Sequence, residues 1–344
     1  MEQGRWPGLS PPQADKTGAS AMGKRRTLRA SCPAGQKTEE LETMETGAFA
    51  GPTSGPMPYG RAAVIAFVNE KGGVAKTTSC VNLGAAIAQR KTRVLCIDLD
   101  PQANLTTAFG VSAEQAIARE AHCLLTMPRF PLERAIVSTR VQNLDLVPAS
   151  ARLADCDKAL VMEVGREGRL RAKLRDFYRS VLTEKYDVVL VDCPPSLDLL
   201  TINALAAATH MIVPVNTKFY ALKGMSLLGE MVATLHEQLG ATVKMLGILV
   251  TMFDKSTALD VTIYRLLKEK VEREFGDYMF STLISKSVLV SEAEAGGFPV
   301  LLREPNSKAA AAYHALADEV AKRLQPDMAG LLAAVPEAAR AYLS

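Results

Sequence analysis

Short runs of apolar, largely β-branched residues alternate along the chain with longer amphipathic segments. The runs predict buried strands, because each is brief and bounded by polar or turn-forming residues; they lie at 64–68, 93–98, 144–148, 186–195, 211–215 and 245–253. Helical periodicity marks 79–89, 112–125, 149–162, 165–184, 220–238, 257–271 and 307–324. Strands that alternate with helices predict an α/β fold with a doubly wound, mostly parallel sheet and helices on both faces.

Three local details refine this pattern. Short strands are expected within 279–290, and Ser307 is expected to cap the last helix. The basic side chains of the helix at 165–184 are expected to form a solvated face; they are Arg166, Arg169, Arg171, Lys173 and Arg175.

The two ends of the chain lack this pattern. Residues 1–60 are rich in Gly, Pro, Ser, Thr and charge, which predicts a disordered tail, and 326–344 predict a short helical tail. We expect one domain between them, at 61–325. The basic cluster at 24–26 has two interpretations, a nucleic-acid-binding arm or an ordinary solvated tail.

Composition excludes several classes of protein. The net charge of +3 over 344 residues predicts no partner from bulk charge. The six cysteines form no C-x-x-C pair and most lie in apolar patterns, so they are expected to be reduced and buried. The sequence has no apolar stretch long enough to cross a membrane and no signal-peptide pattern, which predicts a cytoplasmic protein.

The candidate chemistry centres on residues 64–78, VIAFVNEKGGVAKTT. A buried strand, a glycine loop and a helix follow one another here, which is the context of a phosphate-binding loop. Backbone N–H groups and the helix dipole then point at one anion. Lys76 is placed to reach the β- and γ-phosphates, and the hydroxyl of Thr77 to ligate Mg²⁺.

This loop departs from the strict P-loop pattern, because glycines are missing at Glu70 and Ala75 and a second lysine, Lys71, precedes the glycine pair. The string K-G-G-x-x-K-T-T resembles the deviant Walker A motif of the ParA/Soj/MinD group of P-loop ATPases. The resemblance implies nucleotide contacts from Lys71, Gly72, Gly73, Val74, Ala75, Lys76, Thr77 and Thr78. Because alanine is strained at positive φ, we expect a negative φ at Ala75.

Carboxylates close two of the expected strands. Asp98 ends the strand at 93–98, and Asp100 follows it within D-L-D-P-Q. Asp192 ends the most apolar strand. Parallel strands deliver such groups to one edge of the sheet, beside the phosphate loop. Asp98 and Asp192 are candidate holders of Mg²⁺, and Asp100 is the candidate to position an attacking water. D-x-D-P-Q matches the second motif of the same family.

The resemblance covers nearly all of 64–324 and is carried by three motifs. It implies an ATP- and Mg²⁺-dependent ATPase that moves plasmids or chromosome origins. Two subunits would form a sandwich dimer around two nucleotides, with Lys71 crossing to the partner's phosphates. The resemblance further implies non-specific binding to double-stranded DNA, association with the nucleoid, and stimulation by a ParB/Spo0J-type protein. No stable membrane association is expected.

Late positions carry the remaining implied contacts. Lys255, Lys286 and Lys308 match the DNA-binding lysines of Soj-like proteins. Met252, Ser285 and Ser287 are expected near the nucleotide; the family often has Pro-Arg-Asn where this chain has Ser285-Lys286-Ser287, and Arg where this chain has Leu289.

Three alternatives stay open at this point. A MinD-like regulator of division-site placement requires a C-terminal amphipathic helix with lysines, and the segment after Pro326 has none. A reductase or metal-inserting relative requires interfacial cysteine ligands at suitable spacing. A nucleotide-binding scaffold without turnover is disfavoured by the presence of Lys76, Asp100 and Asp192 together.

Overall fold

The computed structural model describes residues 59, 62–180, 186–218, 223–241 and 243–324. The chain divides into two units, and all described residues belong to the unit Thr43–Ser344. The two expected tails, 1–60 and 326–344, lie outside the described residues except for Tyr59.

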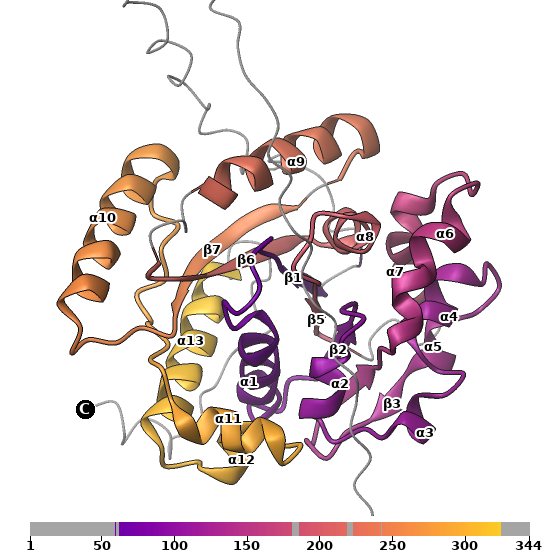
Figure 1. Ribbon diagram of the computed structural model, residues 1–344. Coiled ribbons are helices and arrows are strands. Elements are labelled where there is room, and N and C mark those ends of the chain that lie inside the picture. Colours follow the sequence, from indigo (N-terminus) through magenta and orange to yellow (C-terminus); the bar gives the residue numbers. More distant parts are fainter. Residues whose placement is uncertain (1–58, 60–61, 181–185, 219–222, 242, 325–344) are drawn as a thin grey trace, which may run out of the picture. The chain divides into compact units, whose positions relative to one another are not determined.

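A seven-stranded sheet forms the centre of the described unit (Figure 1), and six of its strands are the ones that the apolar runs predicted. Its order is β3-β4-β2-β5-β1-β6-β7, and every neighbouring pair is parallel except the edge pair β3–β4. The strands are β1 (Ala63–Phe67), β2 (Val94–Asp98), β3 (Val137–Ser138), β4 (Leu144–Val147), β5 (Val188–Asp192), β6 (His210–Asn216) and β7 (Lys244–Thr251). The two-residue strand β3 has no signal in the sequence pattern.

Side chains of the central strand alternate between two apolar cores. Val64 and Ala66 of β1 face one core, whereas Ile65 and Phe67 face the other. The first core also contains buried residues of the helices from 121–126 to 258–275, and the second contains those of the first and last helices. Because β1 is buried on both faces, it reads as a continuous apolar run.

Helices of two groups cover these faces. On one face lie α1 (Lys76–Ala88), α2 (Asn104–Ala108), α11 (Val288–Ala295), α12 (Val300–Arg303) and α13 (Lys308–Leu324). The other face is covered by α4 (Ala121–Thr126), α5 (Leu132–Ala135), α6 (Cys156–Leu160), α7 (Arg169–Arg179), α8 (Leu199–Ala207), α9 (Lys223–Leu239) and α10 (Ala258–Phe275). Figure 1 shows α1 beside α13. The cap of α13 is confirmed, since the N–H of Ala310 donates to Ser307 Oγ at 3.1 Å.

Three expected helices are shorter or broken. The segment 112–125 forms α3 (Ala113–Ala116) and α4, separated by Ala118 at φ 61°, because the N–H of Ala121 donates to the carbonyl of Pro148. The segment 149–162 forms a 3₁₀ helix η1 (Ala151–Asp155) followed by α6, and 165–184 forms η2 (Arg166–Gly168) and α7. The first of these breaks depends on a contact distant in sequence, which helical periodicity does not record.

The expected solvated face of α7 is wrong at Lys173. Its side chain is buried, and Nζ donates to the carbonyls of Met127 (3.0 Å), Pro128 (2.8 Å) and Phe130 (2.6 Å). Three carbonyl acceptors offset the cost of burying an ammonium group. This lysine therefore fastens α7 to the turn between α4 and α5.

The prediction of strands within 279–290 is also largely wrong. Only isolated bridges form there, Ile248 with Met279 and Phe253 with Ser285, and α11 begins at Val288. The segment follows β7 without joining the sheet as a strand.

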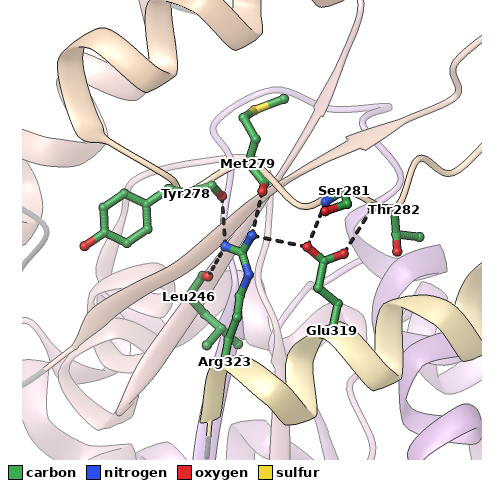
Figure 2. A network of polar contacts seen from close by, with 7 residues as sticks. All are labelled: Leu246, Tyr278, Met279, Ser281, Thr282, Glu319 and Arg323. Carbon is green, nitrogen blue, oxygen red and sulfur yellow. Dashed lines mark hydrogen bonds and ion pairs between the residues drawn. The ribbon is translucent and has the colours of Figure 1, made fainter. Parts of the chain in front are cut away.

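Two residues of α13 hold this segment in place (Figure 2). The guanidinium of Arg323 donates to the carbonyls of Leu246 (2.9 Å), Tyr278 (3.3 Å) and Met279 (2.5 Å), and it pairs with Glu319 at 3.2 Å. Glu319 in turn accepts from the N–H groups of Ser281 and Thr282 at 2.8 and 3.1 Å. Backbone groups that a strand would satisfy are thus satisfied by side chains.

Candidate active site

A cavity of about 530 Å³ opens at the carboxyl end of β1. Its lining comes from five parts of the chain: the glycine loop with the start of α1, the segment from β2 to α2, Pro195 in the loop after β5, Met252 directly after β7, and the end of α11. The lining residues are Gly72, Gly73, Val74, Ala75, Lys76, Thr77, Thr78, Asp100, Gln102, Asn104, Thr107, Ala108, Pro195, Met252, Glu294 and Ala295. The predicted phosphate loop therefore forms the floor of a real cavity.

Lys76 lies buried at the first residue of α1. Its Nζ donates to the carbonyls of Asn69 (3.0 Å) and Lys71 (3.1 Å), which closes the loop on itself. Burial lowers the pKa of this ammonium group, while the nearby Asp192, Cys193 and Asp100 oppose that shift. A charged lysine is thus held within the loop and directed toward the edge where the carboxylates lie.

Two polar side chains, one at the start of the loop and one on β7, hold the loop from behind. Asn69 Nδ2 donates to the carbonyl of Pro214 (2.7 Å), and its Oδ1 accepts from the N–H of Lys71 (2.9 Å). Thr251 Oγ1, at the end of β7, is within hydrogen-bond distance of the carbonyls of Val74 (3.0 Å) and Val215 (3.1 Å). These bonds fix the loop before any ligand arrives.

The backbone of the loop corrects one expectation. Ala75 has φ 55° and ψ 38°, so the predicted negative φ is wrong. Gly73 also has a positive φ of 69°, which costs a glycine nothing, whereas an alanine is strained there. Met252, on the opposite wall, has φ 53°. Strained residues of this kind gather at functional sites, where the surroundings hold them in place.

Asp98 and Asp192 lie side by side at the carboxyl ends of two central strands, as predicted. They are register partners on β2 and β5, and both are fully buried. Asp98 accepts from Thr106 Oγ1 (2.7 Å), Thr106 N (2.9 Å) and Asp100 N (3.1 Å). Burial nevertheless raises the pKa of Asp98 to about 7, against the opposing effect of these donors.

Asp192 differs from Asp98 in its hydrogen bonding. Neither of its buried oxygens has a hydrogen-bond partner within the part of the chain that the structure describes. Burial, and then repulsion from Asp98, raise the pKa of Asp192, although Thr77 and Lys76 are close enough to oppose the shift. A buried carboxylate without donors, next to a hydroxyl and a second carboxylate, fits a hard divalent cation such as Mg²⁺.

Asp100 lies on the wall of the cavity and is nearly buried. Its Oδ1 accepts from the N–H of Gln102 at 2.9 Å, and its carbonyl accepts from the N–H of Ala103. The turn thereby fixes the carboxylate, and its second oxygen remains available to a molecule in the cavity.

Several lining residues were missed by the sequence analysis. Gln102, Asn104 and Thr107 follow Asp100 within a few residues, so their proximity to a recognised motif was a usable signal. Glu294 had none, because it lies 216 residues from Thr78, whose Oγ1 contacts its Oε2 at 3.3 Å. A close approach of Gly297 to Gly110, where an added Cβ would lie 3.0 Å from the Gly110 Cα, brings the end of α11 near α2.

Other predicted site residues lie outside this lining. Lys71, Ser285 and Ser287 do not line the cavity, although the pairing of Ser285 with Phe253 brings their segment to the end of β7. Lys255 and Lys286 are both exposed and flank that pairing, since the N–H of Lys286 donates to the carbonyl of Phe253. Lys308 is exposed on a separate element, at the start of α13.

The cysteine prediction is confirmed where the structure describes it. Cys80, Cys96, Cys123, Cys156 and Cys193 are free and buried, and Cys32 lies outside the described residues. In the described part of the chain, no helix combines the length and hydrophobicity that crossing a membrane requires.

Comparisons with known proteins agree with this geometry. Residues 62–245 match a family model described as an AAA domain. The sporulation initiation inhibitor protein Soj of Bacillus subtilis is 39% identical over 258 residues, which cover 75% of this chain and 98% of Soj. The chromosome partitioning protein ParA of Myxococcus xanthus is 35% identical over 282 residues, 80% of this chain and 96% of that protein.

Solved structures agree as well. The crystal structure of cobyrinic acid a,c-diamide synthase from Mycobacterium smegmatis, with bound ADP and magnesium, has a TM-score of 0.64 and 29% sequence identity. The match covers 80% of this chain and 99% of that one.

Proposed function

Because this chain belongs to the ParA/Soj family of partitioning ATPases, we propose that it dimerises around ATP, binds DNA without sequence preference and is stimulated by a ParB/Spo0J-type partner. The chemical step is hydrolysis of ATP to ADP and phosphate with Mg²⁺. The observation that carries the chemistry is the meeting of the Lys76 loop with the Asp98–Asp192 pair at one end of the sheet.

The roles follow from the positions of the side chains. The N–H groups of the loop Gly72–Thr78 bind the phosphates, and Lys76 exchanges its two backbone carbonyls for phosphate oxygens. Thr77 and Asp192 would hold Mg²⁺, and Asp98 would contribute through water. When bound, the ion neutralises charge on the β- and γ-phosphates. Asp100, fixed by Gln102, orients the attacking water.

Dimerisation is supported by the position of Lys71. This residue is in the glycine loop but does not line the cavity of its own subunit. In a dimer this lysine would reach the phosphates of the second subunit, where its charge would stabilise the transferring phosphoryl group as an arginine finger does.

DNA binding is supported by the exposed pair Lys255 and Lys286 on either side of the Phe253–Ser285 pairing. This pairing lies directly beyond Met252, which lines the cavity. A dimer has two copies of this lysine pair, so it would contact more DNA phosphates without any new residue. A nucleotide that reorders this wall of the cavity would also change the number of DNA phosphates contacted. An ATP-bound dimer would for that reason associate with the nucleoid.

The test is fluorescence anisotropy of a labelled random duplex across a salt series, with a non-hydrolysable ATP analogue and with ADP. We expect tight, sequence-independent and salt-sensitive binding with the analogue, and weak binding with ADP. Equal binding in both states would reject a nucleotide switch.

A result in which the protein binds no DNA is also informative. Binding to anionic vesicles with ATP, in the absence of any DNA binding, would support the MinD-like alternative instead. Stimulation by a partner is tested by adding the candidate ParB-type protein with DNA and measuring phosphate release.

A further inference from the structure

Glu294 joins α11 to the phosphate loop. It lines the cavity, and its Oε2 accepts a hydrogen bond from Thr78 Oγ1 at 3.3 Å. Thr78 is the last residue of the K-G-G-x-x-K-T-T motif and also lines the cavity. A carboxyl group thus contacts a loop that is otherwise built to receive an anion.

The second oxygen of this carboxyl group is shielded from water. Its Oε1 is buried and has no hydrogen-bond partner in the described part of the chain. The buried hydroxyls of Ser79 and Tyr313 likewise have no partner there, and the charge of Glu294 acts on Tyr313. Burial raises the pKa of Glu294, and the hydrogen bond from Thr78 is the opposing influence.

Charged groups lie at the margins of this region. Lys76 and Asp100 line the same cavity, and Arg303 of α12 donates to the carbonyl of Glu292 on α11. Tyr313 is the titratable group that faces Glu294 from α13. Of these two cations, Lys76 donates to carbonyls of the loop, and Arg303 donates to a carbonyl of α11.

The hydroxyl of Thr78 has a single proton to donate. Nucleotide phosphates offer only acceptors, and so does an ionised carboxylate. Thr78 can satisfy one of the two, and an ionised Glu294 additionally repels a phosphate in a poorly solvated cavity. A neutral Glu294 does not repel the phosphates. It also leaves the proton of Thr78 to them, because it has its own proton to donate.

We propose that Glu294 is a positioning residue of the nucleotide site, whose carboxyl group competes with the phosphates for the proton of Thr78. Nucleotide binds more tightly when this carboxyl group is neutral, and binding draws a proton onto it. The inference rests on nucleotide binding at the phosphate loop. It gives the site a proton-linked affinity that the motif by itself does not encode.

The test compares Mg·ADP affinity of the wild type and Glu294→Gln at pH 5 and pH 8, by isothermal titration calorimetry. Glutamine has the shape of the neutral acid. We expect the variant to bind about tenfold more tightly than the wild type at pH 8, the size of one charge-assisted hydrogen bond. The ratio should approach one at pH 5. Because both proteins are compared at each pH, titration of the nucleotide itself cancels from the ratio of the two affinities.

Two controls isolate the mechanism. Glu292→Gln removes an exposed carboxylate from the same helix and should leave the ratio near one at both pH values. In a Thr78→Val background the effect of Glu294→Gln should shrink, because the contested proton is gone. Calorimetry in buffers of different ionisation enthalpy should show proton uptake at pH 8 by the wild type that the variant lacks.

The outcomes separate this inference from the proposed function. A wild type that binds no Mg·ADP at either pH would reject nucleotide binding itself. Normal binding with a ratio that does not change with pH would overturn the role of Glu294 alone. Weaker binding by Glu294→Gln at pH 8 would also overturn it, since the carboxylate would then be a direct acceptor for the nucleotide.

Discussion

Asp98 and Asp192 lie directly opposite each other on β2 and β5, and both are shielded from water. Asp98 has three hydrogen-bond donors, whereas Asp192 has none in the described part of the chain. Two neighbouring buried carboxylates cannot both ionise without cost. This arrangement should weaken the metal-free fold, and a divalent cation bound between the carboxylates would offset that cost.

This arrangement predicts a pH-dependent stability in EDTA. The pKa of Asp98 is raised from 3.8 to about 7, so between these values the folded state binds more protons than the unfolded state. The free energy of unfolding should therefore fall as pH rises through this window. Asp192→Asn should flatten the slope and raise stability at pH 8 by about 1–3 kcal/mol. Urea unfolding from pH 5 to 8 measures both.

Metal addition supplies the control for that experiment. Mg²⁺ with ADP should stabilise the wild type and should stabilise Asp192→Asn much less. Equal stabilisation of the two proteins would remove Asp192 from the metal site.

Lys76→Ala should lower the affinity for Mg·ATP by about ten- to a hundredfold, because a charge-assisted contact to the phosphates is lost. It should leave the fold intact, since the two carbonyls that Nζ now binds belong to the same short loop. Lys322→Ala, an exposed change on α13, is the matched control. Unchanged affinity in Lys76→Ala would contradict the assignment of the loop.

Asp100→Ala should lower kcat for ATP hydrolysis by about a hundredfold or more while ATP binding persists, because a water-orienting group acts mainly in the transition state. Size-exclusion chromatography with ATP should then show an accumulated dimer. Gln102 makes only a backbone contact to Asp100, so Gln102→Ala is the control that preserves the N–H donor. Wild-type turnover by Asp100→Ala would exclude this role.

Ala75→Gly should stabilise the protein. The left-handed backbone at Ala75 costs an alanine about 1–2 kcal/mol, whereas the extra freedom of glycine in the unfolded chain costs about 0.4–1 kcal/mol. The net gain in unfolding free energy should be about 0.5–1 kcal/mol. Ala85→Gly, inside α1, should instead destabilise by about 1 kcal/mol or more. A loss of stability in Ala75→Gly would show that the left-handed backbone does not strain Ala75.

Lys255→Ala and Lys286→Ala should each weaken DNA binding on all sequences alike. Each should also reduce the slope of log affinity against log salt by about one. Lys268→Ala, on α10, is the control because its ammonium group already pairs with Glu272 at 3.6 Å. Dimerisation with ATP should be unaffected in all three variants. A slope that stays constant in both test variants would place the DNA-binding surface elsewhere.

The sequence by itself determined the main strands of the sheet and the functional groups at their carboxyl ends. Buried strands such as β1 and β5 are continuous apolar runs, and strand ends on one side of a parallel sheet meet, so Asp98 and Asp192 were predictable from order alone. The phosphate loop was predictable because its function depends on consecutive residues between a strand and a helix.

Only the tertiary structure decided the rest. The break between α3 and α4, the burial of Lys173 and the contact between Glu294 and Thr78 all depend on partners tens to hundreds of residues away. The φ of Ala75 depends on the bonds that hold the loop from behind, through Asn69 and Thr251. Local patterns record the period of the backbone and the polarity of its faces, whereas these features arise when distant segments satisfy one another's polar groups.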